Sequence, residues 1–153
     1  MKYILYTDGG SRGNPGPAAI GVVICRPAGD HPKGDNEKLE IIKKYGEPLG
    51  ETTNNEAEYQ ALIFGLKKLK QVFGKDVMKK SQLEIRMDSE LIVKQMSHQY
   101  KIEEPNLQQL FLKVWNLMLD FGPIKFTAIP REQNKEADAL VNQALDAKQG
   151  NLL

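Results

Sequence analysis

The spacing of the apolar residues changes at Thr52, and this change limits the folds that the chain can adopt. Before Thr52, apolar runs at 3–7, 18–25 and 39–49 are separated by segments rich in glycine and proline. Such runs predict three strands joined as an antiparallel meander, with 27–38 as a long hairpin tip. After Thr52, leucines recur at helical spacing, so a helix follows the meander.

Helices and strands then alternate along the chain. We expect helices at 54–73, 90–100, 107–121 and 135–148, and strands at 83–87 and 124–129. The predicted N-caps are Thr53, Ser89, Asn106 and Asn134, the third in a capping box with Gln109. A meander followed by this alternation predicts an α/β fold with a five-stranded mixed sheet, three strands antiparallel and two parallel, flanked by helices.

Length and composition bound the class of protein. The chain has 153 residues, 41% apolar and 27% charged, as in one globular domain, which we place at 1–148 with a frayed tail at 149–153. Cys25 is the only cysteine, which excludes a disulfide within the chain and a cysteine zinc site. No apolar run could span a membrane and no signal peptide precedes the first strand, so we expect a cytoplasmic protein.

The charge of the chain is nearly balanced, at +1, and gives no global sign of nucleic-acid binding. The segment 67–80 is nevertheless rich in lysine, with six lysines against the single Asp76. Two interpretations stay open: a solvated helix face, which is the commoner origin of such a run, or a patch that follows a phosphate backbone.

Two aspartates stand where predicted strands end. Asp8 opens a predicted turn, Asp8-Gly9-Gly10, after the first strand, and Asp88 ends the fourth. Because the carboxyl ends of parallel neighbouring strands meet at one edge of a sheet, both side chains are expected there, where open α/β sheets bind ligands. Each aspartate alone could equally begin a turn or cap the next helix.

Two further carboxylates lie on the inner faces of predicted helices. Glu58 precedes Leu62 by four residues and shares its core-facing stripe, whereas Glu56 points away and is explained by a capping box with Thr53. Asp138 lies at the inner edge of the last helix. As alternatives, Glu58 could complete a capping box of its own, and Asp138 could simply favour the helix N-terminus.

Together the four carboxylates predict a site for a hard cation. Clustered carboxylates repel one another unless cations lie between them, and oxygen ligands suit Mg²⁺ or Mn²⁺. His31 and His98 lie in polar segments far from these residues. We therefore interpret both histidines as surface residues and expect no zinc site.

Four motifs in order carry a family resemblance. They are Thr7-Asp8-Gly9-Gly10-Ser11 with Gly13-Asn14-Pro15-Gly16, Thr52-Thr53-Asn54-Asn55-Glu56-Ala57-Glu58, Met87-Asp88-Ser89, and Asn134-Lys135-Glu136-Ala137-Asp138-Ala139-Leu140. Through them the chain resembles ribonuclease H of type 1 along nearly its whole length. We expect the single-domain form of that family, because 100–106 is too short and too acidic for a basic handle and no hybrid-binding module precedes the first strand.

The resemblance implies an enzyme that hydrolyses the RNA strand of an RNA–DNA hybrid and leaves 5′-phosphate and 3′-hydroxyl ends. It implies that two ions, Mg²⁺ or Mn²⁺, are held by Asp8, Glu58, Asp88 and Asp138. One ion would activate the attacking water and the other would stabilise the leaving 3′-oxygen, with Asp8 bridging the pair. The implied substrate contacts are Gly9, Gly10, Asn55 and Glu90 for the RNA strand, and Asn14, Thr53 and Asn55 for a DNA phosphate.

Two details of the resemblance leave alternatives open. Many members carry a histidine in the loop before the last carboxylate, but Ile129–Gln133 has none. Arg131 takes this region and could bind a phosphate through two hydrogen bonds, although it cannot transfer protons near neutral pH, so some activity on double-stranded RNA would not be surprising. Asn54 and Asn55 could instead serve only as helix caps.

Two other classes of protein stay open at this stage: a nucleic-acid binding module without turnover, and another nuclease on the same fold. The four carboxylates argue against the first, since a binding module gains nothing from gathering them. The motif at 52–58 favours the hybrid nuclease over the second. The expected partner is the RNA–DNA hybrid duplex; we expect no membrane, no obligatory protein partner and a monomeric chain.

Overall fold

Five strands form one sheet in the computed structural model, which describes residues 1–29 and 37–150. In chain order they are β1 (Lys2–Ser11), β2 (Gly16–Pro27), β3 (Leu39–Thr52), β4 (Gln82–Met87) and β5 (Ile124–Ala128). Their order across the sheet is β3-β2-β1-β4-β5; the first three strands are antiparallel, and β4 and β5 run parallel to β1. The predicted mixed sheet is confirmed. Residues 30–36 of the predicted hairpin tip, with His31, lie outside the described residues.

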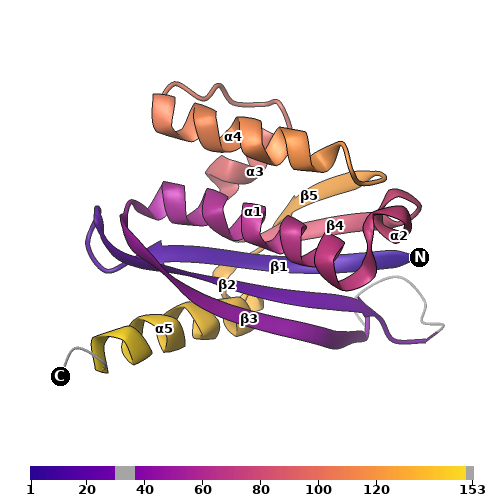
Figure 1. Cartoon of the computed structure of the whole chain (residues 1–153), viewed down its shortest axis with the longest axis horizontal. Helices are drawn as coiled ribbons and strands as arrows, with labels where there is room; N and C mark the ends of the chain where they lie inside the picture. Colours follow the sequence, from indigo (N-terminus) through magenta and orange to yellow (C-terminus); the bar gives the residue numbers. More distant parts are fainter. Residues whose placement is uncertain (30–36, 151–153) are drawn as a thin grey trace.

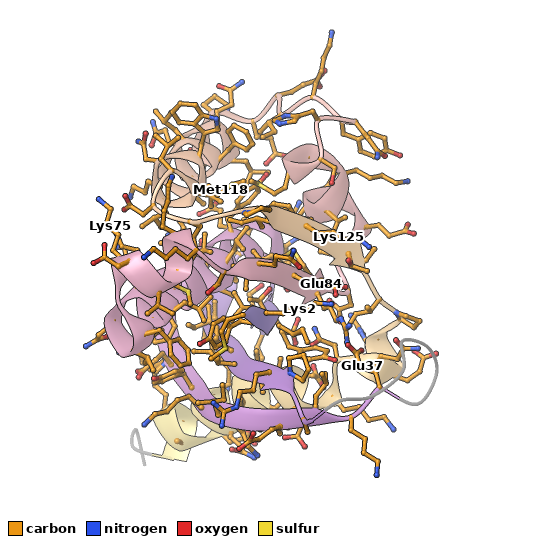
Figure 2. The ribbon with its side chains drawn as sticks, turned by 90° about the vertical axis from the view of Figure 1, so that its right-hand side faces the viewer. Lys2, Glu37, Lys75, Glu84, Met118 and Lys125 are labelled. Carbon is orange, nitrogen blue, oxygen red and sulfur yellow. The ribbon has the colours of Figure 1, made fainter. Side chains whose placement is uncertain are left out.

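Helices cover both faces of this sheet. They are α1 (Asn54–Phe73), α2 (Lys75–Lys79), α3 (Glu90–Met96), α4 (Pro105–Met118), the 3₁₀ turn η1 (Arg131–Gln133) and α5 (Lys135–Gly150). Figure 1 shows α1 against one face, α4 outside α1 as the outermost layer, and α5 against the opposite face. In Figure 2, Lys2 of β1 and Glu84 of β4 lie side by side at one end of the sheet, between these layers. None of the helices in the described residues has the length and apolar character needed to cross a membrane.

The side chains of β1 alternate between the two faces of the sheet. Tyr3 and Leu5 belong to the large core cluster under α1, whereas Ile4 packs with Val23 and Ala137 on the side of α5. The central strand is therefore buried on both faces, which explains why its sequence is a continuous apolar run and does not alternate with polar residues.

The strand β1 continues through the turn that the sequence predicts at Asp8-Gly9-Gly10. Its parallel pairing with β4 ends at Tyr6, but its antiparallel pairing with β2 runs on to Ser11. Gly9 serves close packing: a Cβ at this position would lie 2.3 Å from the carbonyl carbon of Ala57 in α1. The predicted turn is wrong. Glycine is common both in turns and at strand positions where another backbone packs closely, and the sequence does not distinguish the two cases.

The predicted N-caps differ in outcome. Thr53 and Ser89 are confirmed, since each hydroxyl oxygen accepts a hydrogen bond from the backbone N–H three residues later, at 3.2 and 3.3 Å. Asn106 is not a cap. The helix α4 begins at Pro105, two residues before the predicted start at 107, because the fixed φ of proline suits a first helical position.

The helix α3 ends at Met96, before the predicted end at Tyr100. His98 adopts a left-handed conformation with φ of 63°. The backbone N–H groups of Gln99 and Tyr100 both bond to the carbonyl of Lys94, at 2.8 and 3.3 Å, so the last carbonyls of α3 are satisfied by a turn. His98 is exposed, as predicted.

The helix α5 lies directly on β2 and β3 because both strands carry glycine where it crosses them. A Cβ on Gly21 would lie 2.1 Å from the carbonyl oxygen of Ala137, and one on Gly46 would lie 2.8 Å from that of Leu140. The two glycines thus set the depth at which α5 packs, and with it the position of every side chain that α5 directs toward β1.

The helix α5 also extends beyond the predicted end of the domain at residue 148. Gln149 Oε1 accepts a hydrogen bond of 2.6 Å from Arg12 Nη1, and Asp146 forms an ion pair with the same guanidinium at 2.7 Å. The predicted frayed tail therefore does not begin at Gln149; residues 151–153 lie outside the described residues.

We expect Gly21→Ala to lower the free energy of unfolding by about 1–3 kcal/mol, because the added methyl group forces α5 away from the sheet. Equilibrium urea denaturation measures the change. Gly50→Ala is the matched control: it also lies in a strand, but a Cβ there meets nothing within 4 Å. Equal stability of the two variants would contradict the packing described for α5.

Candidate active site

Three carboxylates from three different elements meet at one end of the sheet. Asp8 comes from β1, Glu58 from the second turn of α1, and Asp88 from the residue after β4. One oxygen of each lies within 4.8 Å of the others. The parallel register of β1 and β4, which pairs Tyr6 with Arg86, carries Asp8 and Asp88 to the same edge two residues later.

Glu58 is held in place by β1. Its Oε1 accepts a hydrogen bond of 2.6 Å from the backbone N–H of Gly9, next to Asp8. The Glu58 side chain is 6% exposed and Asp8 is 8% exposed. The second oxygen of Glu58, Oε2, is buried and has no hydrogen-bond partner among the described residues. A buried carboxylate oxygen without a donor is costly unless a cation or a proton satisfies it.

The charges of this cluster oppose one another. Burial, followed by repulsion from Asp88 and Asp138, raises the pKa of Asp8 from 3.8 to about 7. Burial and the neighbouring Asp8 raise the pKa of Glu58 well above its usual value. In the absence of a cation the two groups therefore retain a proton between them near neutral pH, as closely spaced carboxylates do.

Asp88 and Asp138 complete the acidic edge from two sides. Burial raises the pKa of Asp88, while the guanidinium of Arg131, 3.8 Å from its Oδ2, opposes this rise. Asp138 lies in the first turn of α5, and its charge contributes to the raised pKa of both Asp8 and Asp88. It therefore faces the cluster, although its oxygens fall outside the group of three.

A buried side chain that the sequence marks only as a helix cap anchors this end of α5. Asn134 is 1% exposed, and its Nδ2 donates a hydrogen bond of 2.9 Å to the carbonyl of Thr7, the residue before Asp8. The bond ties the start of α5, and so Asp138, to β1. A second buried bond that sequence reasoning misses joins Tyr59 to Gln95 at 2.6 Å. It links α1, which carries Glu58, to α3, which follows Asp88.

The donor set fits a hard divalent cation. All the converging groups are carboxylates, which are the ligands that Mg²⁺ and Mn²⁺ prefer, and no histidine of the described residues belongs to the group. The orphaned Oε2 of Glu58 is the atom that most requires such a partner. Binding of a cation would replace the retained proton and relieve the repulsion.

The residues that the resemblance assigns to a DNA phosphate gather at the start of α1. Asn14 Oδ1 accepts a hydrogen bond of 3.0 Å from the backbone N–H of Asn54, and Asn54 Oδ1 accepts from the N–H of Ser11 at 2.9 Å. These bonds dock the 12–15 loop onto the helix beside Asn55. Because Thr53 is the cap, the alternative that Asn54 or Asn55 caps the helix is wrong.

The residues assigned to the RNA strand differ in how exposed they are. Gly9 is buried and its N–H group is engaged by Glu58, so it cannot also donate to a ligand. Gly10 is partly exposed on the neighbouring position of β1. Glu90 and Arg131 are exposed and line an open hollow of about 560 Å³ together with Asp88.

The lysine-rich segment lies away from the carboxylates. Glu58 is near the start of α1, a helix about 30 Å long. Lys70 lies in the last turn of this helix and Lys75 follows it, and both form ion pairs with Asp120, at 2.6 and 3.1 Å. Lys79 donates a hydrogen bond of 2.9 Å to the carbonyl of Leu119. These three lysines serve local packing at the opposite end of the sheet, which favours the solvated-face interpretation of that segment.

Comparison with known proteins agrees with this geometry. The family described as reverse transcriptase-like matches residues 6–144. Ribonuclease HI of Halobacterium salinarum is 39% identical over 92% of this chain and 63% of its own length. The bifunctional protein Rv2228c of Mycobacterium tuberculosis is 38% identical over 96% of this chain, which spans only 36% of that protein.

Solved structures show the same likeness. LC11-RNase H1 in complex with RNA/DNA hybrid is 43% identical and superimposes with a TM-score of 0.83, over 96% of this chain and 99% of that one. RNase H1 from Halobacterium salinarum gives a TM-score of 0.80 at 37% identity, over 96% and 99% of the two chains. The fold and the acidic edge are those of a ribonuclease H-like domain. The chain belongs to the reverse transcriptase-like family, and within it to the type 1 ribonuclease H group that the sequence resembles.

The raised pKa of Asp8 predicts how stability depends on pH without metal. Since the folded pKa of about 7 exceeds the unfolded value of 3.8, the folded state binds more protons between these values. In a chelator, the free energy of unfolding is therefore expected to fall as the pH rises from about 4 to about 7. Urea denaturation across this range measures the trend.

Asp8→Asn is the matched variant for this trend. It removes one of the repelling charges, so at pH 8 with chelator it should unfold with a free energy at least about 1 kcal/mol higher than the unaltered protein. Asp76→Asn, on the exposed surface of α2, is the control and should change nothing. A metal-free protein whose stability rises with pH over this window would contradict the predicted repulsion.

Proposed function

We propose that the protein is a divalent-metal-dependent endoribonuclease that hydrolyses the RNA strand of RNA–DNA hybrids. The observation that carries the proposal is the convergence of Asp8, Glu58 and Asp88 within 4.8 Å, with a buried Glu58 oxygen that has no partner among the described residues. Relatives named ribonuclease H, and a similar structure solved with RNA/DNA hybrid, support the reaction and the substrate.

The chemistry follows from the ligand set. When bound, two Mg²⁺ or Mn²⁺ ions supply an activated water and charge neutralisation at the leaving 3′-oxygen, so that the products carry 5′-phosphate and 3′-hydroxyl ends. We assign Asp8 to both positions, because an oxygen of Asp8 lies within 4.8 Å of oxygens of Glu58 and Asp88 and the charge of Asp138 also acts on it. Glu58 is fixed by Gly9, and Asp138 approaches from α5 on the other side.

We infer that residues around the carboxylates position the substrate. Asn14, Thr53 and Asn55 surround the start of α1, where short polar side chains and helix N–H groups suit a DNA phosphate. We assign contacts with the RNA strand to Gly10, which is partly exposed two residues after Asp8, and to Glu90, which lines a hollow with Asp88. The Gly9 N–H group orients Glu58, so we assign the predicted RNA-strand contact of Gly9 to atoms other than this N–H group.

Arg131 has a role that differs from the histidine of many relatives. Its guanidinium is exposed and 3.8 Å from Asp88, in the hollow that both residues line. We propose that it leaves Asp88 when metal binds and instead contacts a phosphate, since a cation at the cluster removes the charge that attracts it.

Incubation of the protein with labelled RNA–DNA hybrid, double-stranded RNA, single-stranded RNA and duplex DNA tests the proposal. We expect metal-dependent cleavage of the RNA strand of the hybrid, with no cleavage after chelation. Asp88→Asn should lower the rate at least about a hundredfold, because it removes a charged ligand without changing shape. The end groups are read by extension with a polymerase, which requires a free 3′-hydroxyl.

The control for this variant is Asp76→Asn, which removes the same charge from an exposed position on α2. It should cleave the hybrid at the unaltered rate. Equal cleavage of duplex DNA, or full activity in chelator, would overturn the proposed function. Cleavage of double-stranded RNA as well would define the substrate range without affecting the metal site.

A further inference from the structure

One buried hydrogen bond joins two helices that carry or follow carboxylates of the site. The hydroxyl group of Tyr59 in α1 donates to Oε1 of Gln95 in α3 at 2.6 Å. Tyr59 is completely buried and Gln95 is 5% exposed, so water does not compete for this bond. The two residues are 36 positions apart in the chain, so the bond is a tertiary contact between the helices. We call it the α1–α3 bond.

Each end of the α1–α3 bond lies close in the sequence to a carboxylate of the site. Tyr59 directly follows Glu58 in α1. Gln95 lies in α3, a helix of seven residues that begins two residues after Asp88, with Ser89 as its cap. A displacement of α1 relative to α3 would therefore change the separation of Glu58 and Asp88.

Two hydrogen bonds from adjacent residues fix α1 about its own axis. Glu58 accepts a bond of 2.6 Å from the backbone N–H of Gly9 in β1. Tyr59, the next residue, donates the α1–α3 bond. Successive residues of an α-helix point about 100° apart, so the two bonds hold the helix from two directions. Loss of either bond allows α1 to rotate or shift, and Glu58 moves with it.

The separations between the three carboxylates are each set by a different contact. The parallel pairing of β1 with β4 sets the separation of Asp8 and Asp88. The hydrogen bond from β1 to Glu58 sets the separation of Asp8 and Glu58. The separation of Glu58 and Asp88 is the remaining one, and the α1–α3 bond acts on it.

Stability alone does not require a polar pair at this position. Tyr59 belongs to the same core cluster as the apolar side chains Ile92 and Met96 of α3. Replacing both partners of a buried hydrogen bond by apolar groups of similar shape can leave stability nearly unchanged, whereas a satisfied polar pair specifies one packing arrangement. The α1–α3 bond is therefore better explained by the geometry that it fixes than by the stability that it adds.

We propose that Tyr59 and Gln95 are positioning residues for the metal site: the α1–α3 bond holds Glu58 at the separation from Asp88 at which both carboxylates bind a divalent cation. This inference rests on the proposed function, because it assigns the carboxylates to a cation. Neither Tyr59 nor Gln95 is a ligand. Both act on the affinity for the metal, since ligands that are held in place before binding lose less conformational freedom when the cation arrives.

Titration calorimetry with Mn²⁺ alone, without nucleic acid, measures this affinity. Tyr59→Phe removes only the hydroxyl group and should raise the dissociation constant for Mn²⁺ at least about fivefold, because Glu58 is then less firmly held. Gln95→Leu removes the acceptor and should have an effect of the same size. A dissociation constant within about twofold of that of the unaltered protein, for either variant, would overturn the proposal.

The double variant, Tyr59→Phe with Gln95→Leu, separates positioning from packing. It leaves neither partner of the bond unpaired, so its stability in urea should exceed that of either single variant. Its dissociation constant for Mn²⁺ should stay raised by the same factor as in the single variants, because all three lack the same bond. Recovery of the metal affinity together with the stability would overturn the positioning role.

Ser81→Ala is the matched control for a lost hydroxyl group. Ser81 is buried, lies just before β4, and donates a hydrogen bond of 2.6 Å to the carbonyl of Val77. It is at the end of β4 opposite to Asp88, so the variant should lose stability and keep its affinity for Mn²⁺. A rise in the dissociation constant as large as that of Tyr59→Phe would trace both effects to general destabilisation and overturn the proposal.

Cleavage of the hybrid distinguishes this inference from the proposed function. In Tyr59→Phe, the Mn²⁺ concentration that gives half the maximal rate should rise, while KM for the hybrid at saturating Mn²⁺ should stay unchanged, because the α1–α3 bond acts on the metal ligands. An unchanged metal dependence in a variant of a protein that does cleave the hybrid would overturn the positioning role alone. Weakened Mn²⁺ binding in the variant of a protein that does not cleave the hybrid would support the positioning role and contradict the proposed function.

Discussion

Electrostatic repulsion between buried carboxylates is the constraint around which this molecule is arranged. Asp8 and Glu58 are both nearly inaccessible to water, and burial raises the pKa of each. The fold tolerates this because the Gly9 N–H group binds one oxygen of Glu58 at 2.6 Å, and because a retained proton or a bound cation offsets the remaining charge. A site built in this way holds its ligands ready before the metal arrives, at the expense of stability when metal is absent.

Close backbone approach is what brings the carboxylates together. Glu58 reaches Asp8 because Gly9 lets α1 lie against β1, and Asp138 reaches the same edge because Gly21 lets α5 lie against β2. Each helix delivers its carboxylate from a different face of one sheet. These glycines therefore position the carboxylates through packing distance, and the buried bond from Asn134 to Thr7 fixes the start of α5 against β1.

The charges at the other end of the sheet are paired with one another. Lys70 in the last turn of α1 and Lys75 after it pair with Asp120, and Lys79 donates to the carbonyl of Leu119. The molecule thus separates an acidic site at one end of the sheet from ion-paired lysines at the other end. The acidic site suits a divalent cation.

The sequence by itself determined the five strands, their mixed sheet and the helices α1, α3, α4 and α5, but not α2 or η1, and it indicated that Asp8, Glu58 and Asp88 converge. Apolar periodicity and isolated carboxylates at strand and helix ends are local signals that survive folding. The extension of β1 through Gly9 and Gly10 and the anchoring role of Asn134 were decided only by the tertiary structure. Each depends on a neighbour distant along the chain. A glycine in a strand and a glycine in a turn cannot be distinguished from the local sequence, and Gly9 lies in a strand because the backbone of Ala57 packs directly against it.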